Sequence, residues 1–591
     1  MPSPQALDYF ASVDAAPGGI VQISLNHRKL LGIVLAAAPV SELRQAVKRS
    51  SFRLKPIEKI ICGEEVIPKI HLKLIIWTSQ YYYTPLGLMA KTFLPRYFAQ
   101  PTKKFLSELS VFNIGPPTSK TRLSIVPELY KIDLLQNKNP DLKYAAVIHG
   151  GISAKNEWAI WKLARQGGIK DIIGTRSAFA IGLSALEKIT VYDAESPYHK
   201  SFDQQPYINA KNVAVKLAEL TATPIVLEGQ FSTKASSIPA SIQVIDMKSE
   251  LKNGNYSIFS KQMQVRLKKT IEENKQAVLF INRRGLSTGL LCRDCGNVVK
   301  CPNCDAPFVY HNTKYLILDT NTKYQLLCHH CGQRKIPPSV CPNCQSYKIK
   351  FIGTGTQRVE GELRKLFPNA PSERLDLDIA PKWTDQQRIF DKFRAKKFSI
   401  LIGTQLILKE ELLPRVDLAA IVTIDPLLSL PDFRMGEQIA KIIDMLLRTS
   451  KTLPVQTYKP DNEIFKCLLE SEPDNFYSSW LAQELENRKA LSFPPFSQII
   501  NLTYAHADTQ KAEQEAKILM NKLGEQARNY QLPITSCQLL GPAPAFIPLR
   551  KNRYIWQIMI KSKIEDLRIR NKLLSVVPSD WKIDVDPVTM V

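Results

Sequence analysis

The chain has 591 residues, too many for one hydrophobic core, so about three to five domains are expected. Its 79 Lys and Arg exceed its 55 Asp and Glu by 24 charges, which favours nucleic acid as a partner over an anionic membrane surface or a merely soluble basic enzyme. No segment approaches the ~20 apolar residues that span a bilayer, and the N-terminus lacks a secretory signal, so a cytoplasmic protein is expected.

The first 95 residues combine short β-like runs with one helical stretch. Apolar residues cluster at Ile20–Leu25 and Leu30–Leu35, and an aromatic, helix-like segment follows at Leu72–Tyr83. These patterns predict a small, β-rich N-terminal domain over residues 1–95. Residues 96–122 are basic and contain prolines, so they are expected to form a linker.

Two series of alternating apolar strands and helical stretches follow, which is the pattern of α/β domains with parallel sheets. The predicted strands are Tyr144–His149, Asp171–Ile173, Ile189–Tyr192 and Pro224–Leu227 in the first series, and Gln276–Ile281, Ser399–Ile402 and Leu418–Ile424 in the second. The expected domains are residues 123–240, residues 241–291 together with 346–495, and an α+β tail at 496–591.

Eight cysteines lie in one segment, at residues 292–345. They form four Cys-x-x-Cys pairs: Cys292/Cys295, Cys301/Cys304, Cys328/Cys331 and Cys341/Cys344. Each pair places two thiolates on one side of a tight turn, and two turns complete a tetrahedral zinc site with no position open for a substrate. The alternatives are surface thiols or a redox dithiol, which four such pairs make the weaker interpretation. The segment therefore predicts two structural zinc ions.

Short polar motifs follow several of the apolar strands. They are Asp171-Ile-Ile-Gly-Thr-Arg176, Asn282-Arg283-Arg284-Gly285, Gly353-Thr-Gly355-Thr-Gln357-Arg358, Ile402-Gly-Thr-Gln405 and Leu430-Pro-Asp432-Phe-Arg434. Each places small and polar groups at the carboxyl end of a strand, where α/β sheets bind ligands. A single Gly-Thr turn is more often only a tight turn, but the ordered set is specific.

With these motifs, the sequence resembles the primosomal protein N′ family, the PriA replication-restart DNA helicases. The resemblance runs from about Leu7 to the end of the chain. It is carried by Leu7-Asp8-Tyr9, Gly18-Gly-Ile-Val21, Val126-Pro-Glu128, His149-Gly-Gly-Ile-Ser153, Phe280-Ile-Asn-Arg-Arg-Gly285, Phe493-Pro-Pro-Phe496 and Asp584-Val-Asp-Pro587.

The resemblance implies an α/β protein with two RecA-like helicase lobes, a zinc insert in the second lobe and DNA-binding domains at both ends. It also implies nested zinc sites, which pair the outer cysteines with one another and the inner cysteines with one another. The first site is Cys292, Cys295, Cys341 and Cys344, and the second is Cys301, Cys304, Cys328 and Cys331. Forked and single-stranded DNA, primosome and helicase-loading proteins, and single-stranded DNA-binding protein are the implied partners.

The sequence departs from the family where ATP is hydrolysed. No Gly-Lys-Thr or Gly-Lys-Ser occurs, so no phosphate-binding loop is found, and the winged-helix domain is missing. Asp193-Ala-Glu195 stands where the family has Asp-Glu-Glu, so Asp193 and Glu195 are expected to be vestigial. Only Arg448 stands where the family carries arginine fingers. These losses predict degenerate helicase lobes that do not hydrolyse ATP, and they leave an ATP/Mg²⁺ cofactor in doubt.

Basic segments persist near both ends of the chain. Eight Lys or Arg face two acids between Arg28 and Lys59, and again between Gly541 and Lys572. A solvated basic face is the alternative to DNA contact. The expected DNA-contacting residues, including aromatic residues for base stacking, are Asp8, Tyr9, Arg28, Lys29, Tyr198, Tyr207, Arg550, Lys551 and Arg553.

The sequence thus predicts a replication-restart protein that binds abandoned forks and promotes reloading of the replicative helicase, without helicase activity of its own. Two alternatives stay open. One is an active ATP-dependent 3′–5′ helicase of the same family, and the other is a zinc-containing nucleic-acid-binding protein unrelated to restart.

Overall fold

The computed structural model describes residues 9–590 apart from a set of internal segments. Those segments are residues 12–14, 26–27, 39–54, 111–118, 184, 203, 230–240, 283–288, 293–298, 304–307, 313–323, 329–332, 348, 353–354, 410–411, 429, 431, 473–474 and 534–535. The chain divides into two compact units, and each is described separately. One unit comprises residues 1–232, 522–532 and 564–588, and the other comprises 233–521, 533–563 and 589–591. The expected C-terminal domain of residues 496–591 therefore contributes to both units.

The N-terminal part of the first unit holds short strands followed by four helices. Its elements are β1 (Tyr9–Phe10), β2 (Ile20–Leu25), β3 (Arg28–Ile33), β4 (Lys55–Pro56), β5 (Lys59–Cys62), α2 (Lys69–Tyr81), α3 (Leu86–Thr92), α4 (Arg96–Ala99) and α5 (Lys103–Ser110). Strands β3, β2 and β5 form an antiparallel sheet, and β1 pairs with β4. The β-rich start and the helix near Leu72–Tyr83 are confirmed.

The expected linker at residues 96–122 contains two helices. Phe105 of α5 is buried, with its ring in edge contact with Phe98 of α4 and Trp158. The indole N–H of Trp158 donates a hydrogen bond to Glu108 at 2.8 Å. This aromatic packing fixes α4 and α5 on the α/β part of the unit.

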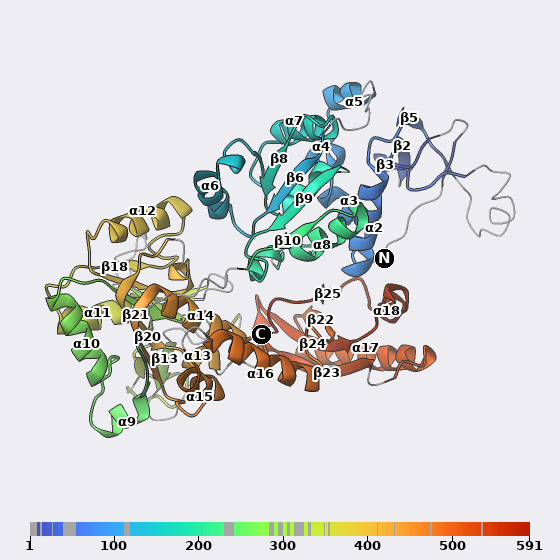
Figure 1. Ribbon diagram of the computed structural model, residues 1–591. Helices are drawn as coiled ribbons and strands as arrows, with labels where there is room; N and C mark the ends of the chain where they lie inside the picture. The colour runs from blue at the N-terminus through green and yellow to red at the C-terminus, as the bar shows by residue number, and fades with distance from the viewer. Residues whose placement is uncertain are drawn as a thin grey trace. The chain divides into compact units, whose positions relative to one another are not determined.

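The rest of the first unit is a parallel α/β domain. Its elements are β6 (Thr121–Ile125), α6 (Leu129–Lys138), η1 (Pro140–Leu142), β7 (Ala146–Ile148), α7 (Ala154–Arg165), β8 (Asp171–Gly174), η2 (Arg176–Ile181), β9 (Leu186–Val191), η3 (Pro197–His199), α8 (Ala210–Thr221) and β10 (Ile225–Leu227). The unit also contains α18 (Leu567–Leu574) and β25 (Lys582–Val585) from the tail, which are not part of the parallel sheet. The sheet order is β10-β9-β6-β8-β7, and every pairing is parallel (Figure 1). All four strands expected in this series are present.

The second unit is built on a six-stranded parallel sheet of order β11-β21-β20-β12-β19-β18. Its elements before the tail, outside the cysteine-rich insert, are β11 (Ser241–Asp246), α9 (Met247–Lys252), α10 (Lys261–Glu272), β12 (Ala277–Ile281), α11 (Thr356–Leu366), β18 (Ser372–Leu375), α12 (Trp383–Arg394), β19 (Ile400–Gly403), η5 (Gln405–Ile407), β20 (Val416–Thr423), α13 (Asp425–Leu428), α14 (Met435–Thr449), β21 (Ser450–Thr457), α15 (Glu463–Glu470) and α16 (Phe476–Ala490). Every residue of β12 is buried, as expected for a central strand covered on both faces. The three strands expected in this series are confirmed.

The remaining elements of the second unit are antiparallel strands and one long helix. The insert holds β13 (Gly289–Cys292), β14 (Val309–Asn312), β15 (Tyr324–Leu327), β16 (Arg334–Lys335) and β17 (Ile349–Ile352). The tail holds β22 (Gln498–His506), β23 (Cys537–Arg550), β24 (Arg553–Ser562) and α17 (Thr509–Asn529), of which residues 522–529 belong to the first unit. Strand β13 pairs with β17, and β14, β15 and β16 form a second small sheet. Among the described residues, no helix combines the length and apolar character needed to cross a bilayer.

Candidate nucleotide and nucleic-acid sites

The carboxyl ends of β6, β8 and β9 bring three sequence motifs to one edge of the first sheet. The amide of Val126 donates to the carbonyl of Gly174, and the amide of Tyr192 donates to the carbonyl of Ile125, both at 2.9 Å. Because parallel strands all end on the same side, Asp193 lies beside the Val126-Pro-Glu128 turn. In such sheets this edge is the position for a bound ligand.

Asp193 is held there by a cation that the sequence did not suggest. The ammonium of Lys131, at the start of α6, lies 3.1 Å from both carboxylate oxygens of Asp193. Both residues are buried, with side chains only 5% and 11% exposed. Asp193 also has a positive φ of 48°, which an aspartate tolerates better than most residues. The pair joins positions 62 residues apart, so no local pattern could have identified Lys131.

Glu195 is turned toward the end of β10. A Cβ atom built on Gly229 would lie 3.4 Å from a carboxylate oxygen of Glu195, so this carboxylate packs against the glycine backbone. The amide of Ala194 donates to the carbonyl of Glu228 at 2.9 Å. The Asp193-Ala-Glu195 turn is therefore held by the neighbouring strand end.

Arg448, in the second unit, is engaged within its own helix. Its guanidinium Nε lies 2.8 Å from a carboxylate oxygen of Asp444, one turn earlier on α14. The carboxylate is buried and the guanidinium is about one-fifth exposed. This ion pair positions Arg448 against α14.

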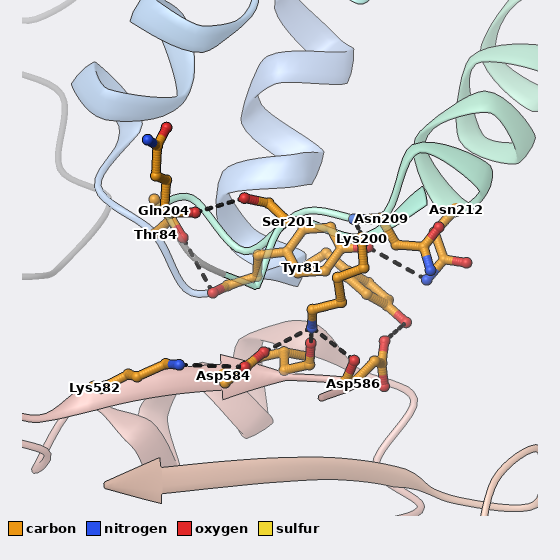
Figure 2. A network of polar contacts seen from close by, with 12 residues as sticks. Tyr81, Thr84, Lys200, Ser201, Gln204, Asn209, Asn212, Lys582, Asp584 and Asp586 are labelled. Atoms are coloured by element: carbon orange, nitrogen blue, oxygen red, sulfur yellow. Dashed lines mark hydrogen bonds and ion pairs between the residues drawn. The ribbon is translucent and has the colours of Figure 1, made fainter. Parts of the chain in front are cut away.

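The loop from Tyr198 to Tyr207 is anchored by a buried lysine, and Figure 2 shows the anchoring contacts. The Lys200 ammonium donates to the Asp584 carboxylate at 2.7 Å and to the Asp586 carbonyl at 2.6 Å, and it also contacts the Val585 carbonyl. Its side chain has no exposed surface, and burial lowers the pKa of Lys200 although Asp584 opposes the shift. The loop is thus fixed to the C-terminal segment.

The aromatic residues of this loop differ in accessibility. Tyr198 is 37% exposed and Phe202 is 52% exposed, so both rings present surface to solvent. The Tyr207 ring is half-buried beneath the ammonium of Lys582, which lies 4.2 Å from the ring centroid. Tyr198 and Phe202 are therefore the more accessible rings of this loop, whereas part of the Tyr207 ring is covered by a cation–aromatic contact.

The same C-terminal segment closes the end of helix α2. The guanidinium of Arg570 donates to the carbonyls of Gln80 and Tyr81 at 2.6 and 2.7 Å, and the Tyr81 hydroxyl donates to Asp586 at 2.8 Å. The last carbonyls of a helix lack intrahelical donors, so Arg570 satisfies two of them. Burial lowers the pKa of Arg570 to about 10, which leaves it charged at neutral pH.

The N-terminal candidates are only partly described. Asp8 lies outside the described residues, and so does the side chain of Arg28. Tyr9 is half-buried, and its hydroxyl donates to the Ser24 carbonyl at 3.4 Å. Lys29 is exposed and lies 3.4 Å from Glu58. The structure thus places Tyr9 beside β2, and DNA contact by these N-terminal residues stays a prediction.

The three C-terminal candidates gather at one hairpin tip. Arg550 ends β23 and Arg553 begins β24, with Lys551 and Asn552 forming the turn between them. All four side chains are exposed. The three predicted residues thus lie on one exposed turn, and DNA contact by them stays a prediction.

Four of the eight clustered cysteines have described side chains. Cys301, Cys328 and Cys341 are buried, and Cys344 is exposed. The amides of Asn343 and Cys344 point at the Cys341 sulfur, at 3.4 and 3.5 Å. The side chains of the other four, Cys292, Cys295, Cys304 and Cys331, lie outside the described residues. The two four-cysteine sites stay a prediction.

Comparisons with known proteins match both ends of the chain to family models. The 3′ DNA-binding domain model matches residues 1–95, and the primosomal protein N C-terminal domain model matches residues 489–588. Yeast Dbp5 bound to RNA and ADP BeF3 is a solved structure with 10% identity that covers 72% of this chain and 98% of its own. Its TM-score is only 0.31, which is too low to support a conclusion about this chain.

Curated relatives match most of the chain. The replication restart protein PriA of Bacillus subtilis is 31% identical over 474 residues, which cover 76% of this chain and 56% of the relative. The PriA of Thermotoga maritima is 30% identical over 506 residues, covering 80% of this chain and 64% of the relative. The chain thus spans a little over half the length of such relatives. The matches at both ends and across the middle make the chain similar to PriA replication restart proteins over most of its length.

Proposed function

We propose that the chain acts in replication restart by binding forked and single-stranded DNA and promoting reloading of the replicative helicase. The observation that carries this proposal is the pair of family matches at the two ends, one of them to a 3′ DNA-binding domain. The net charge of +24 supports a polyanionic partner. Because the chain spans only 56% to 64% of the two relatives compared, every activity of the whole protein is a proposal.

The protein performs this role without hydrolysing ATP, and its two parallel sheets are degenerate RecA-like lobes. Support comes from the Lys131 ammonium, which faces the carboxylate on which a nucleotide-bound magnesium would depend. A magnesium ion would have to displace the Lys131 ammonium from the Asp193 carboxylate. Arg448 is likewise paired with Asp444. The residues present therefore do not fit an ATP–magnesium complex.

Zinc fits the cysteine-rich insert. Amide hydrogen bonds to the Cys341 sulfur are the arrangement that stabilises a thiolate ligand in a Cys-x-x-Cys turn. Cys301 and Cys328 are buried in one apolar cluster, where two thiolates without a metal would be costly. Four thiolates close the coordination sphere, so each of two zinc ions would have a structural role.

The DNA contacts come from the two ends and the exposed aromatic residues. Lys29 and the hairpin-tip cations would contact phosphates, and Tyr198 would stack on an unpaired base. Leu7, Asp8 and Tyr9 would hold the 3′ end of a nascent strand, and Arg28 would contact DNA beside them. Helicase-loading proteins, single-stranded DNA-binding protein and a cytoplasmic location stay predictions from the sequence.

Fluorescence anisotropy with forked, duplex and single-stranded DNA, together with an ATPase assay, tests this function. We expect tighter binding to a fork with a 3′ end at its junction than to plain duplex, and no DNA-stimulated hydrolysis. Equal affinity for fork and duplex would refute the restart function, and tighter binding to RNA would favour the unrelated nucleic-acid-binding protein. Hydrolysis that is abolished by Asp193→Ala would instead identify an active helicase.

A further inference from the structure

The tip of the β23–β24 hairpin concentrates positive charge at an energetic cost. Arg550 and Arg553 are directly opposite in the strand register, and like charges in that position destabilise a hairpin. Lys551 adds a third cation in a turn where it and Asn552 have positive φ values of 53° and 57°. Such a two-residue turn normally uses Asn, Asp or Gly at both positions. A lysine there and two opposed arginines indicate selection for an anionic partner.

This tip is docked on the cysteine-rich insert. The amide of Asn552 donates to the carbonyl of Asn303 at 2.8 Å, within the turn that follows Cys301. Farther along the hairpin, Ile547 packs against the buried cluster that contains Cys301 and Cys328. The hairpin is therefore fixed by both a polar and an apolar contact to the segment predicted to bind zinc.

The insert adds its own cations beside the docking point. The Asn303 side chain donates to Gln333 at 3.4 Å, and Gln333 immediately precedes Arg334 and Lys335 of β16. Both of these cations are exposed, as is Lys300 just before Cys301. The described residues of these contacting segments, 299–303, 333–335 and 550–553, contain six cations and no acid.

We propose that the hairpin tip and the cysteine-rich insert form one composite surface that binds a single DNA sugar-phosphate backbone. The inference rests on the proposed DNA-binding function and adds where one backbone is held and by which residues. Asn303 sets the position of the two cation groups, because it bonds Asn552 of the hairpin turn on one side and Gln333, the residue before β16, on the other. Phosphate contacts of this kind make binding independent of sequence and sensitive to salt.

Two charge variants test the composite surface by anisotropy with forked DNA at several salt concentrations. The hairpin variant replaces Arg550, Lys551 and Arg553 with Gln, and the insert variant is R334Q/K335Q. A matched control, K268Q/K269Q, removes two exposed cations from α10 in the same unit. We expect each test variant to weaken binding at least ~10-fold and to lower the salt slope on duplex DNA by about 0.9 for each phosphate that it leaves without a cation. The control should bind as wild type.

An undocking variant, Ile547→Gln, asks whether the two groups act as one surface. It keeps every cation, so a composite surface predicts a loss of affinity approaching that of the hairpin variant. Adding the hairpin substitutions to Ile547→Gln should then lower the affinity for forked DNA by less than a further ~2-fold. If the two surfaces were independent, the fold-losses in affinity would multiply. Hydrogen exchange of residues 537–562 verifies that the strands still form. If this variant misfolds, the charge variants alone decide.

The outcomes separate this inference from the function on which it rests. Wild-type protein without fork binding would refute the proposed function. Wild-type fork binding that neither charge variant weakens would overturn only the composite surface. Wild-type affinity in Ile547→Gln, with the hairpin shown to be released, would also overturn it.

Discussion

Replacing Lys131 with methionine should strongly destabilise the first α/β domain. Methionine keeps the length and apolar character of the lysine stem but removes the ammonium that lies 3.1 Å from both oxygens of Asp193. The carboxylate side chain is only 11% exposed, so water compensates for little of the lost interaction. In the Lys131→Met variant we therefore expect the unpaired, buried Asp193 carboxylate to raise the free energy of the folded state.

The size of the effect follows from the geometry. At 3.1 Å and an effective dielectric constant of about 20, two unit charges attract by about 5 kcal/mol. Breaking a buried pair by removing one partner typically costs about 3–5 kcal/mol. Asp193→Asn in the same chain should recover part of that cost, because it removes the charge and keeps a residue that tolerates positive φ.

Hydrogen exchange measured by mass spectrometry on peptides from β6 and β9 reads this cost locally. Lys131→Met should lower protection by about 10²–10⁴-fold, which corresponds to about 3–5 kcal/mol. The double variant with Asp193→Asn should lose less protection than the sum of the two single effects predicts. Lys188→Met is the control, because Lys188 is an exposed residue of β9 itself. A free energy of opening for Lys131→Met within about 1 kcal/mol of wild type would refute the ion-pair reasoning. Strictly additive effects of the Lys131 and Asp193 substitutions would refute it as well.

Three further results are expected. Lys200→Met should make residues 564–588 more susceptible to limited proteolysis, because it leaves buried acceptors without their ammonium donor. Lys582→Met, which changes a side chain that is 40% exposed, should be cleaved as wild type. Equal cleavage of the two variants would contradict the anchoring role of Lys200. Burial lowers the pKa of His71 from 6.5 to about 4 in the folded protein. Between pH 6.5 and 4 the unfolded chain therefore binds more protons at this residue than the folded chain does, and roughly 3 kcal/mol of folding stability is lost as the pH falls through this range. Melting temperatures from pH 7 to 4 should show this loss in wild type and a smaller one in His71→Gln. Purified protein should contain about two zinc ions by mass spectrometry and Cys341→Ser about one, and a metal-free wild type would rule zinc out.

The strands were predictable because their signal is local. The apolar run Ile20–Leu25 coincides with β2, and Pro224–Leu227 differs from β10 by one residue. A buried strand needs a short stretch of consecutive apolar side chains, and that stretch is visible without knowing its neighbours.

Helix α5 shows where local reasoning fails. Eight residues are too few to form a stable helix alone, and the sequence of residues 103–110 predicts only part of a linker. The helix is fixed by tertiary contacts instead, since Phe105 packs on Trp158 and Glu108 accepts its indole N–H.

The sequence by itself determined the resemblance to PriA proteins, the four cysteine pairs and the absence of a Gly-Lys-Thr or Gly-Lys-Ser motif, because each depends on residue identities at short spacing. Only the tertiary structure decided that Lys131 faces Asp193, that Lys200 holds Asp584 and that Asn552 docks on Asn303. Those partners lie 62, 384 and 249 positions apart in the chain. Residues so distant in sequence meet only when the sheet order and chain path bring them together, and no spacing rule encodes that path.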